Sequence, residues 1–225
     1  MRKTVFLIIT VLLLSVATPS YAQSAKEQRK ERQELAKASK KDLNEKASKA
    51  SRKEAKRLAK EGWTTAPGAL PLEKQLDKSY LMQYQYDTDG FPQFIMAEGM
   101  STGGNYDGAK MQALELAKQN LAGQIQTEIT ALIENTVANE QLDQNDAASV
   151  TRSVLASKNL ISQNIGRVIP VVETYRVVNG KNREVLVRIA YSQAMAKAAA
   201  KNAVKKELEQ RGDSLHNKLD NLLGW

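Results

Sequence analysis

The chain has 225 residues, a formal net charge of +8 and no cysteine. This length suits one ordinary domain with extensions. The missing cysteine excludes disulfides, cysteine-ligated metal sites, thiol nucleophiles and the acylated cysteine that anchors a bacterial lipoprotein.

Residues 1–22 have the three parts of a cleavable secretory signal. Arg2 and Lys3 supply the positive start, and residues 5–16 form an apolar run that is shorter than the about 20 residues needed to span a bilayer. Small residues then precede a predicted cleavage site between Ala22 and Gln23. We therefore expect an exported protein of the periplasm or cell envelope, soluble or peripherally attached and without a lipid anchor.

The positive charge is concentrated in residues 23–62. Residues 24–62 contain 14 Lys and Arg against 7 Asp and Glu, whereas residues 63–225 contain 17 against 18. Ala, Lys, Glu, Leu and Arg dominate this stretch and predict one long charged helix over residues 24–61, ended by Gly62.

A helix that is polar nearly all round is either a solvated stalk or a surface for a partner. In an exported protein, the expected partner is an envelope protein or an anionic surface of lipid headgroups, lipopolysaccharide or acidic glycan. Nucleic acid is not expected as a partner, because the segment lacks aromatic residues among its cations and because an exported protein is separated from the chromosome. The predicted surface contacts are Lys37, Lys40, Lys41, Lys49, Arg52, Lys53, Lys56 and Arg57.

Residues 63–90 read as a linker and a short helix over residues 72–86, and residues 91–225 as a compact domain. In that domain the patterns predict a strand over 94–100, helices over 107–137 and 147–164, strands over 168–178 and 183–191, and a helix over 192–210. Asn179-Gly180 is a favoured hairpin turn between the last two strands. The fold class is therefore α+β: a small antiparallel or mixed sheet in the order β-α-α-β-β-α, with helices on one face.

Residues 103–110 lie between a strand and a helix, where a phosphate-binding loop would lie. Lys110 comes one residue late for that motif, and Met111 replaces the Ser or Thr that would bind magnesium. We therefore expect no nucleotide or other cofactor. The glycines and the hairpin residues are interpreted as structural turn positions: Gly99, Gly103, Gly104, Gly108, Asn179 and Gly180.

The chain offers little catalytic equipment. Its single histidine, His216, has no triad or metal-site partners in the sequence. Paired carboxylates can hydrolyse bonds without histidine or cysteine, and Glu98 and Glu173 fall within predicted strands that could bring them face to face. The carboxylate candidates are Glu98, Asp107, Glu115, Glu128 and Glu173.

Residues 94–125 follow a recognisable pattern of a strand, small residues around Gly99, a variable loop, and a helix with Ala109, Ala113 and Ala117 four residues apart. In this the chain resembles the small bacterial envelope lipoproteins typified by a twenty-kilodalton surface lipoprotein. It is also similar to the N-terminal domain of a flagellar ring assembly protein. The resemblance implies a β-α-β-β-α order and no catalytic residues. This chain departs from the family because it lacks the lipid-anchor cysteine. Its basic segment lies where such a lipoprotein has the tether between its lipid anchor and its domain.

The residues and the resemblance together predict a non-catalytic, exported binding or scaffold protein of the cell envelope. Its basic helix would reach a partner or an anionic surface. Sheet edges and the Leu-rich C-terminal turn offer routes to a homo-oligomer. The alternative is an envelope hydrolase that uses paired carboxylates.

Overall fold

The computed structural model describes residues 29–30, 33–34, 37, 45–88, 90–138 and 144–210, with the backbone alone at 136–138. The chain divides into two units, residues 1–46 and residues 47–225. In the first unit the described residues up to Lys37 are helical. The second unit combines helices with an antiparallel sheet, which confirms the α+β class.

The sheet has three strands, β1 (Phe94–Gly103), β2 (Ile169–Val178) and β3 (Asn182–Ser192), in the order β1-β3-β2. Both pairings are antiparallel, so β3 is the central strand. The predicted hairpin joins β2 to β3, and Asn179 and Gly180 have φ values of 51° and 72°. Asn and Gly tolerate this left-handed region, which explains their place at the turn.

The helix α4 (Tyr106–Ala138) packs against β1 and β3 and forms the core with them. Its buried face is lined by Ala109, Ala113 and Ala117 and then by larger aliphatic residues, beginning at Leu121. Small residues let the helix approach the strands closely. Gly99 lies at the point of closest approach, because a Cβ atom there would meet the Ala113 carbonyl oxygen at 2.1 Å. It is therefore a packing glycine inside β1, where the sequence predicted a turn.

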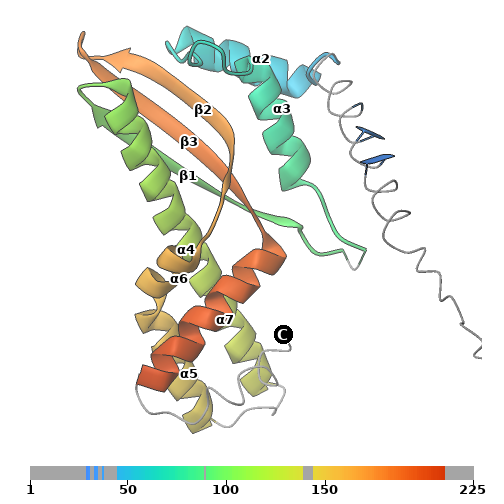
Figure 1. The fold of residues 1–225 in the computed structure, drawn as a ribbon, viewed down its shortest axis with the longest axis vertical. Coiled ribbons are helices and arrows are strands. Elements are labelled where there is room, and N and C mark those ends of the chain that lie inside the picture. The colour runs from blue at the N-terminus through green and yellow to red at the C-terminus, as the bar shows by residue number, and fades with distance from the viewer. Residues whose placement is uncertain are drawn as a thin grey trace, which may run out of the picture. The chain divides into compact units, whose positions relative to one another are not determined.

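Beyond the sheet, the second half of α4 packs with α5 (Gln144–Ala156), α6 (Lys158–Asn164) and α7 (Gln193–Gln210), as Figure 1 shows. The sequence predicted one helix over residues 147–164. The structure instead divides it at Ser157, whose hydroxyl donates to the Val154 carbonyl. A serine that bonds to the backbone in this way competes with helix hydrogen bonding.

Helices cover both faces of the sheet, whereas the sequence predicted one. The helices α2 (Lys49–Lys60) and α3 (Leu72–Gln83) lie on the face opposite α4 (Figure 1). A second apolar cluster there joins Ala55 of α2 and Leu76 of α3 to Val172 of β2. The strands are therefore apolar on both faces at this end of the sheet.

The predicted continuous helix over residues 24–61 is interrupted. Residues 45–48 are not helical, and α2 begins after Ser48, whose side chain accepts from the Ser51 amide. Asp77 of α3 then accepts hydrogen bonds from the Ser48 amide and the Ser51 hydroxyl, at 3.0 and 2.9 Å. These contacts tie the last part of the basic segment to the compact unit, which begins at Ala47.

Candidate functional site

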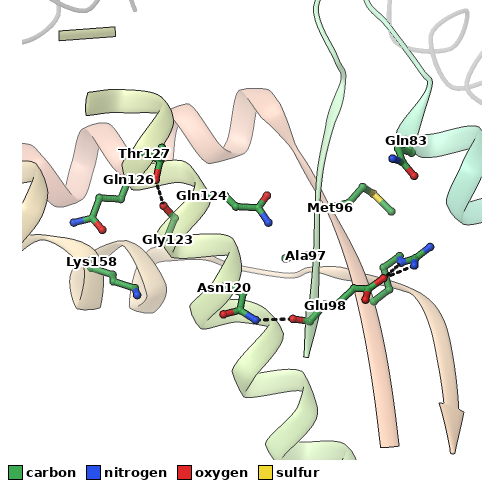
Figure 2. Close-up of a pocket in the computed structure, with 11 residues that line it drawn as sticks. Gln83, Met96, Ala97, Glu98, Asn120, Gly123, Gln124, Gln126, Thr127 and Lys158 are labelled. Atoms are coloured by element: carbon green, nitrogen blue, oxygen red, sulfur yellow. Dashed lines mark hydrogen bonds and ion pairs between the residues drawn. The ribbon is translucent and has the colours of Figure 1, made fainter. Parts of the chain in front are cut away.

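A polar groove of about 830 Å³ follows the outer edge of β1 (Figure 2). Residues of β1 and α4 form its walls, and α3, α6 and β3 contribute one residue each. Carboxamides dominate the lining, and the charged side chains among the described lining residues are Glu98, Lys158 and Arg188. The uncharged polar members are Gln83, Asn120, Gln124, Gln126 and Thr127.

The backbone of β1 presents alternate residues to this groove. At the other edge of the sheet, the backbone of Tyr175 in β2 exchanges two hydrogen bonds of 2.8 Å with Thr64, so the N–H and C=O of Tyr175 point away from β3. Bonded and non-bonded pairs alternate along antiparallel strands, so Val172, three residues before Tyr175, bonds to β3. Its partner there is Arg188, whose backbone N–H and C=O are thereby occupied. Glu98 lies opposite Arg188 in β1, so its own N–H and C=O point outward. Asn120 confirms this direction, because its amide donates to the Glu98 carbonyl at 2.7 Å.

The two edges of the sheet differ in protection. The β2 edge has Pro170, a register shift beside it, and the contact with Thr64. The Glu173 amide on that edge also donates to Gln75. Proline, bulges and covering segments are devices that prevent an edge from pairing with another strand. The β1 edge has no proline, lysine or register shift along its described length.

Glu98 and Arg188 form an ion pair across β1 and β3 at the rim of the groove. Two nitrogens of the guanidinium, Nε and one Nη, contact the same carboxylate oxygen of Glu98. The other Nη donates to the hydroxyl of buried Ser79 at 2.9 Å. The same ion pair also lines a second cavity, of about 320 Å³, between α2 and the sheet. The pair thus separates the open groove from this inner cavity.

Three neighbouring pairs of opposite charge surround the inner cavity. Arg176 contacts Glu184 at 2.5 Å and lies over the ring of Trp63, 4.6 Å from its centroid. Arg57 contacts Glu54 and Glu61 at 2.5 and 2.6 Å. The hydrogen bond from Arg57 holds the pKa of Glu54 below its usual range. The cavity walls are therefore charged but locally neutralised, over an apolar floor that includes Leu58, Leu76 and Val172.

The predicted basic contacts fall into four groups. Lys49, Arg52, Lys53 and Lys56 are exposed along α2, where spacings of three and four residues place them on one face. Arg57 is also exposed, but its guanidinium is committed to the two glutamates. Lys37 is an exposed helical residue of the first unit. Lys40 and Lys41 lie outside the described residues, as do the signal segment with Ala22 and Gln23, and His216.

The carboxylates of Glu98 and Glu173 lie on opposite faces of the sheet, as the strand registers require. They cannot flank one bond together. Glu173 accepts from the Tyr106 hydroxyl and contacts Lys110 at 2.8 Å. Burial, followed by the bond to Glu173, raises the pKa of Tyr106 well above its usual range. Of the other candidates, Asp107 lies in the first turn of α4, Glu115 is exposed, and Glu128 accepts from Gln193.

Residues 104 and 105 alone connect β1 to α4, so of the glycines predicted as turn positions here, Gly104 lies in the connection, Gly103 ends the strand and Gly108 lies in the first turn of the helix. The Gly108 amide donates to the Asn105 side chain at 2.7 Å, and a Cβ atom on Gly103 would lie 3.3 Å from that of Ala109. Gly104 has open space around it. Across the described ranges, no group of three or more His, Asp or Glu side chains is placed to hold a metal ion. None of the described helices combines the length and the apolar character that crossing a bilayer requires.

The sequence did not single out Asn120, Lys158, Arg188 or Ser79. One signal was present for Arg188, since the alternation of β3 places it on the strand's more polar face. Comparison with protein-family models, with curated proteins and with solved structures found no match.

Proposed function

We propose that this chain is a non-catalytic, exported binding or scaffold protein of the cell envelope that holds an extended polypeptide segment along β1. The observation that carries the proposal is the contrast between the two sheet edges. Neighbouring residues block the β2 edge, whereas the outward backbone groups of β1, apart from the Glu98 carbonyl that Asn120 bonds, face a polar groove. An added strand gains affinity from main-chain hydrogen bonds and specificity from its alternate side chains.

The position of α4 favours a strand that carries no helix of its own on that face. A Cβ atom on Gly99 would meet both the Ala113 oxygen and the Ala117 nitrogen, so α4 lies directly over β1. In an antiparallel edge-to-edge pair of two copies, which puts both α4 helices on the same face, the two β1 strands would lie about 4.8 Å apart. Packed helices need about 8–10 Å between their axes, so the two α4 helices would overlap. A peptide segment or a terminal tail avoids this overlap.

Proline substitution at the edge tests the proposal. Ten-residue peptides are selected from a random display library on the folded protein, and the affinity of the best peptide is measured by fluorescence polarisation. We expect Met100→Pro to weaken binding about tenfold or more, because it removes one outward N–H and places a ring in the path of the strand. Val177→Pro is the matched control, since Val177 is an exposed residue that faces outward on the β2 edge.

Methylation of the peptide backbone adds a second readout. N-methyl groups at alternate peptide residues should abolish binding, whereas the same groups at the intervening residues should be tolerated. Equal effects of the two proline variants, or the absence of any selected peptide, would refute the proposal.

A second contact is supported by α2. Its exposed cations Lys49, Arg52, Lys53 and Lys56 form one stripe, and a stripe of this kind attracts anionic surfaces. We expect the full chain to float with phosphatidylglycerol vesicles and to be released by high salt. A triple Lys→Glu change at positions 49, 53 and 56 should abolish flotation. The same change at the exposed residues Lys197, Lys205 and Lys206 of α7 alters the net charge equally and should not; equal loss from both variants would contradict the assignment.

A further inference from the structure

The guanidinium of Arg188 has a second anchor besides Glu98. Arg188 extends from the central strand β3, and its side chain is only 24% exposed. The hydrogen bond from Nη to Ser79 fixes it from the side of α3, where the serine is fully buried. A guanidinium anchored in this way keeps its position when the carboxylate on its other side leaves.

Glu98 is the more loosely held partner. Its side chain is 47% exposed on the outermost strand, so the released carboxylate would pass directly into water. It uses one oxygen for both contacts with Arg188, whereas a carboxylate and a guanidinium form their strongest pair through two parallel hydrogen bonds. An incoming carboxylate with free rotation can adopt the two-bond geometry.

The charge of the groove favours an acidic occupant. Two cations, Arg188 and Lys158, line it against the single carboxylate of Glu98. Within the described part of the chain, no carboxylate pairs with Lys158, which lies over Gly123 with its Nζ 3.7 Å from where a Cβ atom would be. One positive charge of the groove is therefore unbalanced before any ligand arrives.

We propose that Arg188 is the acceptor for a carboxylate of the bound polypeptide segment, and that Glu98 occupies Arg188 as a built-in competitor until the segment displaces it. The inference rests on the proposed function, and it adds that the segment carries an Asp or Glu side chain, or a terminal carboxylate, next to the strand residue that pairs with Glu98. The exchange moves one carboxylate out and one in, so it leaves the charge on Arg188 balanced.

Selection on variants tests this assignment. Random ten-residue peptides are selected in parallel on the wild-type protein, on Glu98→Gln and on Arg188→Gln, and the frequency of acidic residues is compared among the selected peptides. We expect Asp or Glu to be enriched on the wild type and on Glu98→Gln, and this enrichment to be lost on Arg188→Gln. Circular dichroism verifies that each variant is folded.

Affinity measurements sharpen the test. The best acidic peptide should bind Glu98→Gln about twofold to fivefold more tightly than the wild type, because the competitor is gone. Its Glu→Gln counterpart should gain nothing. Glu184→Gln is the matched control, since Glu184 pairs with Arg176 on the same face of the sheet but does not line the groove. A variant that had lost its fold could not bind more tightly, so a gain in affinity is informative by itself.

The possible failures are distinguishable. If selected peptides depend on the β1 edge but show no acidic preference, or if Glu98→Gln gains no affinity, Arg188 is not the acceptor and the edge-binding function stands. If no variant selects any peptide, both the edge-binding function and the role of Arg188 are refuted.

Discussion

Replacing Gly99 by alanine tests the packing on which the whole groove depends. The added Cβ atom would lie 2.1 Å from the Ala113 oxygen and 2.4 Å from the Ala117 nitrogen, where ordinary contacts begin at 3.4 Å. Both atoms belong to the α4 backbone, so no side chain can rotate away. The helix and the strand must therefore separate by roughly 1 Å or more.

Overpacking of a core costs about 1–3 kcal/mol and occasionally more. Because the obstacle is backbone, we expect Gly99→Ala to lie at or above the upper end, about 3 kcal/mol. For a chain of this size, that corresponds to a fall of about 6–12 °C in Tm. Thermal unfolding followed by circular dichroism measures it, with Gly104→Ala as the control, since a Cβ atom there meets nothing within 4 Å. Melting of Gly99→Ala within about 2 °C of the wild type would refute the close approach of α4 to β1.

Three further changes have expected outcomes. Burial opposes the ionised form of Asp77, but the hydrogen bonds from Ser48 and Ser51 together outweigh it and lower the pKa of Asp77. The contribution of Asp77 to stability is therefore present above about pH 4 and is lost as the pH falls through the lowered pKa. Asp77→Asn should reduce Tm at pH 7, and the difference in Tm should shrink in acid. Gly180→Val forces a branched residue to φ 72° and should cost about 1–2 kcal/mol in urea unfolding, whereas an unchanged midpoint would contradict the turn geometry. Tyr106→Phe removes one hydrogen bond to Glu173 and should cost about 1 kcal/mol by the same measurement.

Periodicity along the chain was sufficient to predict most elements of the sheet and of its α4 face. The hairpin at Asn179 and Gly180, the long helix and the closing helix all appear within a few residues of their predicted bounds. These signals are local: a turn dipeptide or an apolar repeat identifies its own element without knowledge of any partner.

The packing of α2 could not be predicted in this way. Its buried residues are Ser51 and Ala55, which in a sequence rich in Ala and Lys look like members of a solvated helix. Ser51 is buried because Asp77 accepts from its hydroxyl, and that partner lies 26 residues further along the chain. Small and polar residues give no hydrophobic stripe, so their burial depends on a tertiary contact that no local pattern records.

The groove could not be predicted from the sequence for a related reason. Which backbone groups of β1 point outward depends on the strand order β1-β3-β2, and the sequence predicted the strands without their order. Gly99 was interpreted as a turn residue because a glycine beside a loop usually is one, whereas its neighbour is the backbone of α4. Arg188 and Glu98 became a pair only through the register of two strands that lie 90 residues apart.

The central position of β3 constrains when the sheet can form during synthesis. A nascent chain that stops before residue 182 contains β1 and β2, which are not neighbours in the sheet, and lacks the strand that joins them. The β2–β3 hairpin is a local pairing, whereas β1 must pair with β3 across a long separation in sequence, a slow kind of step. Roughly four-fifths of the polypeptide is thus synthesised before the strand that joins the sheet together.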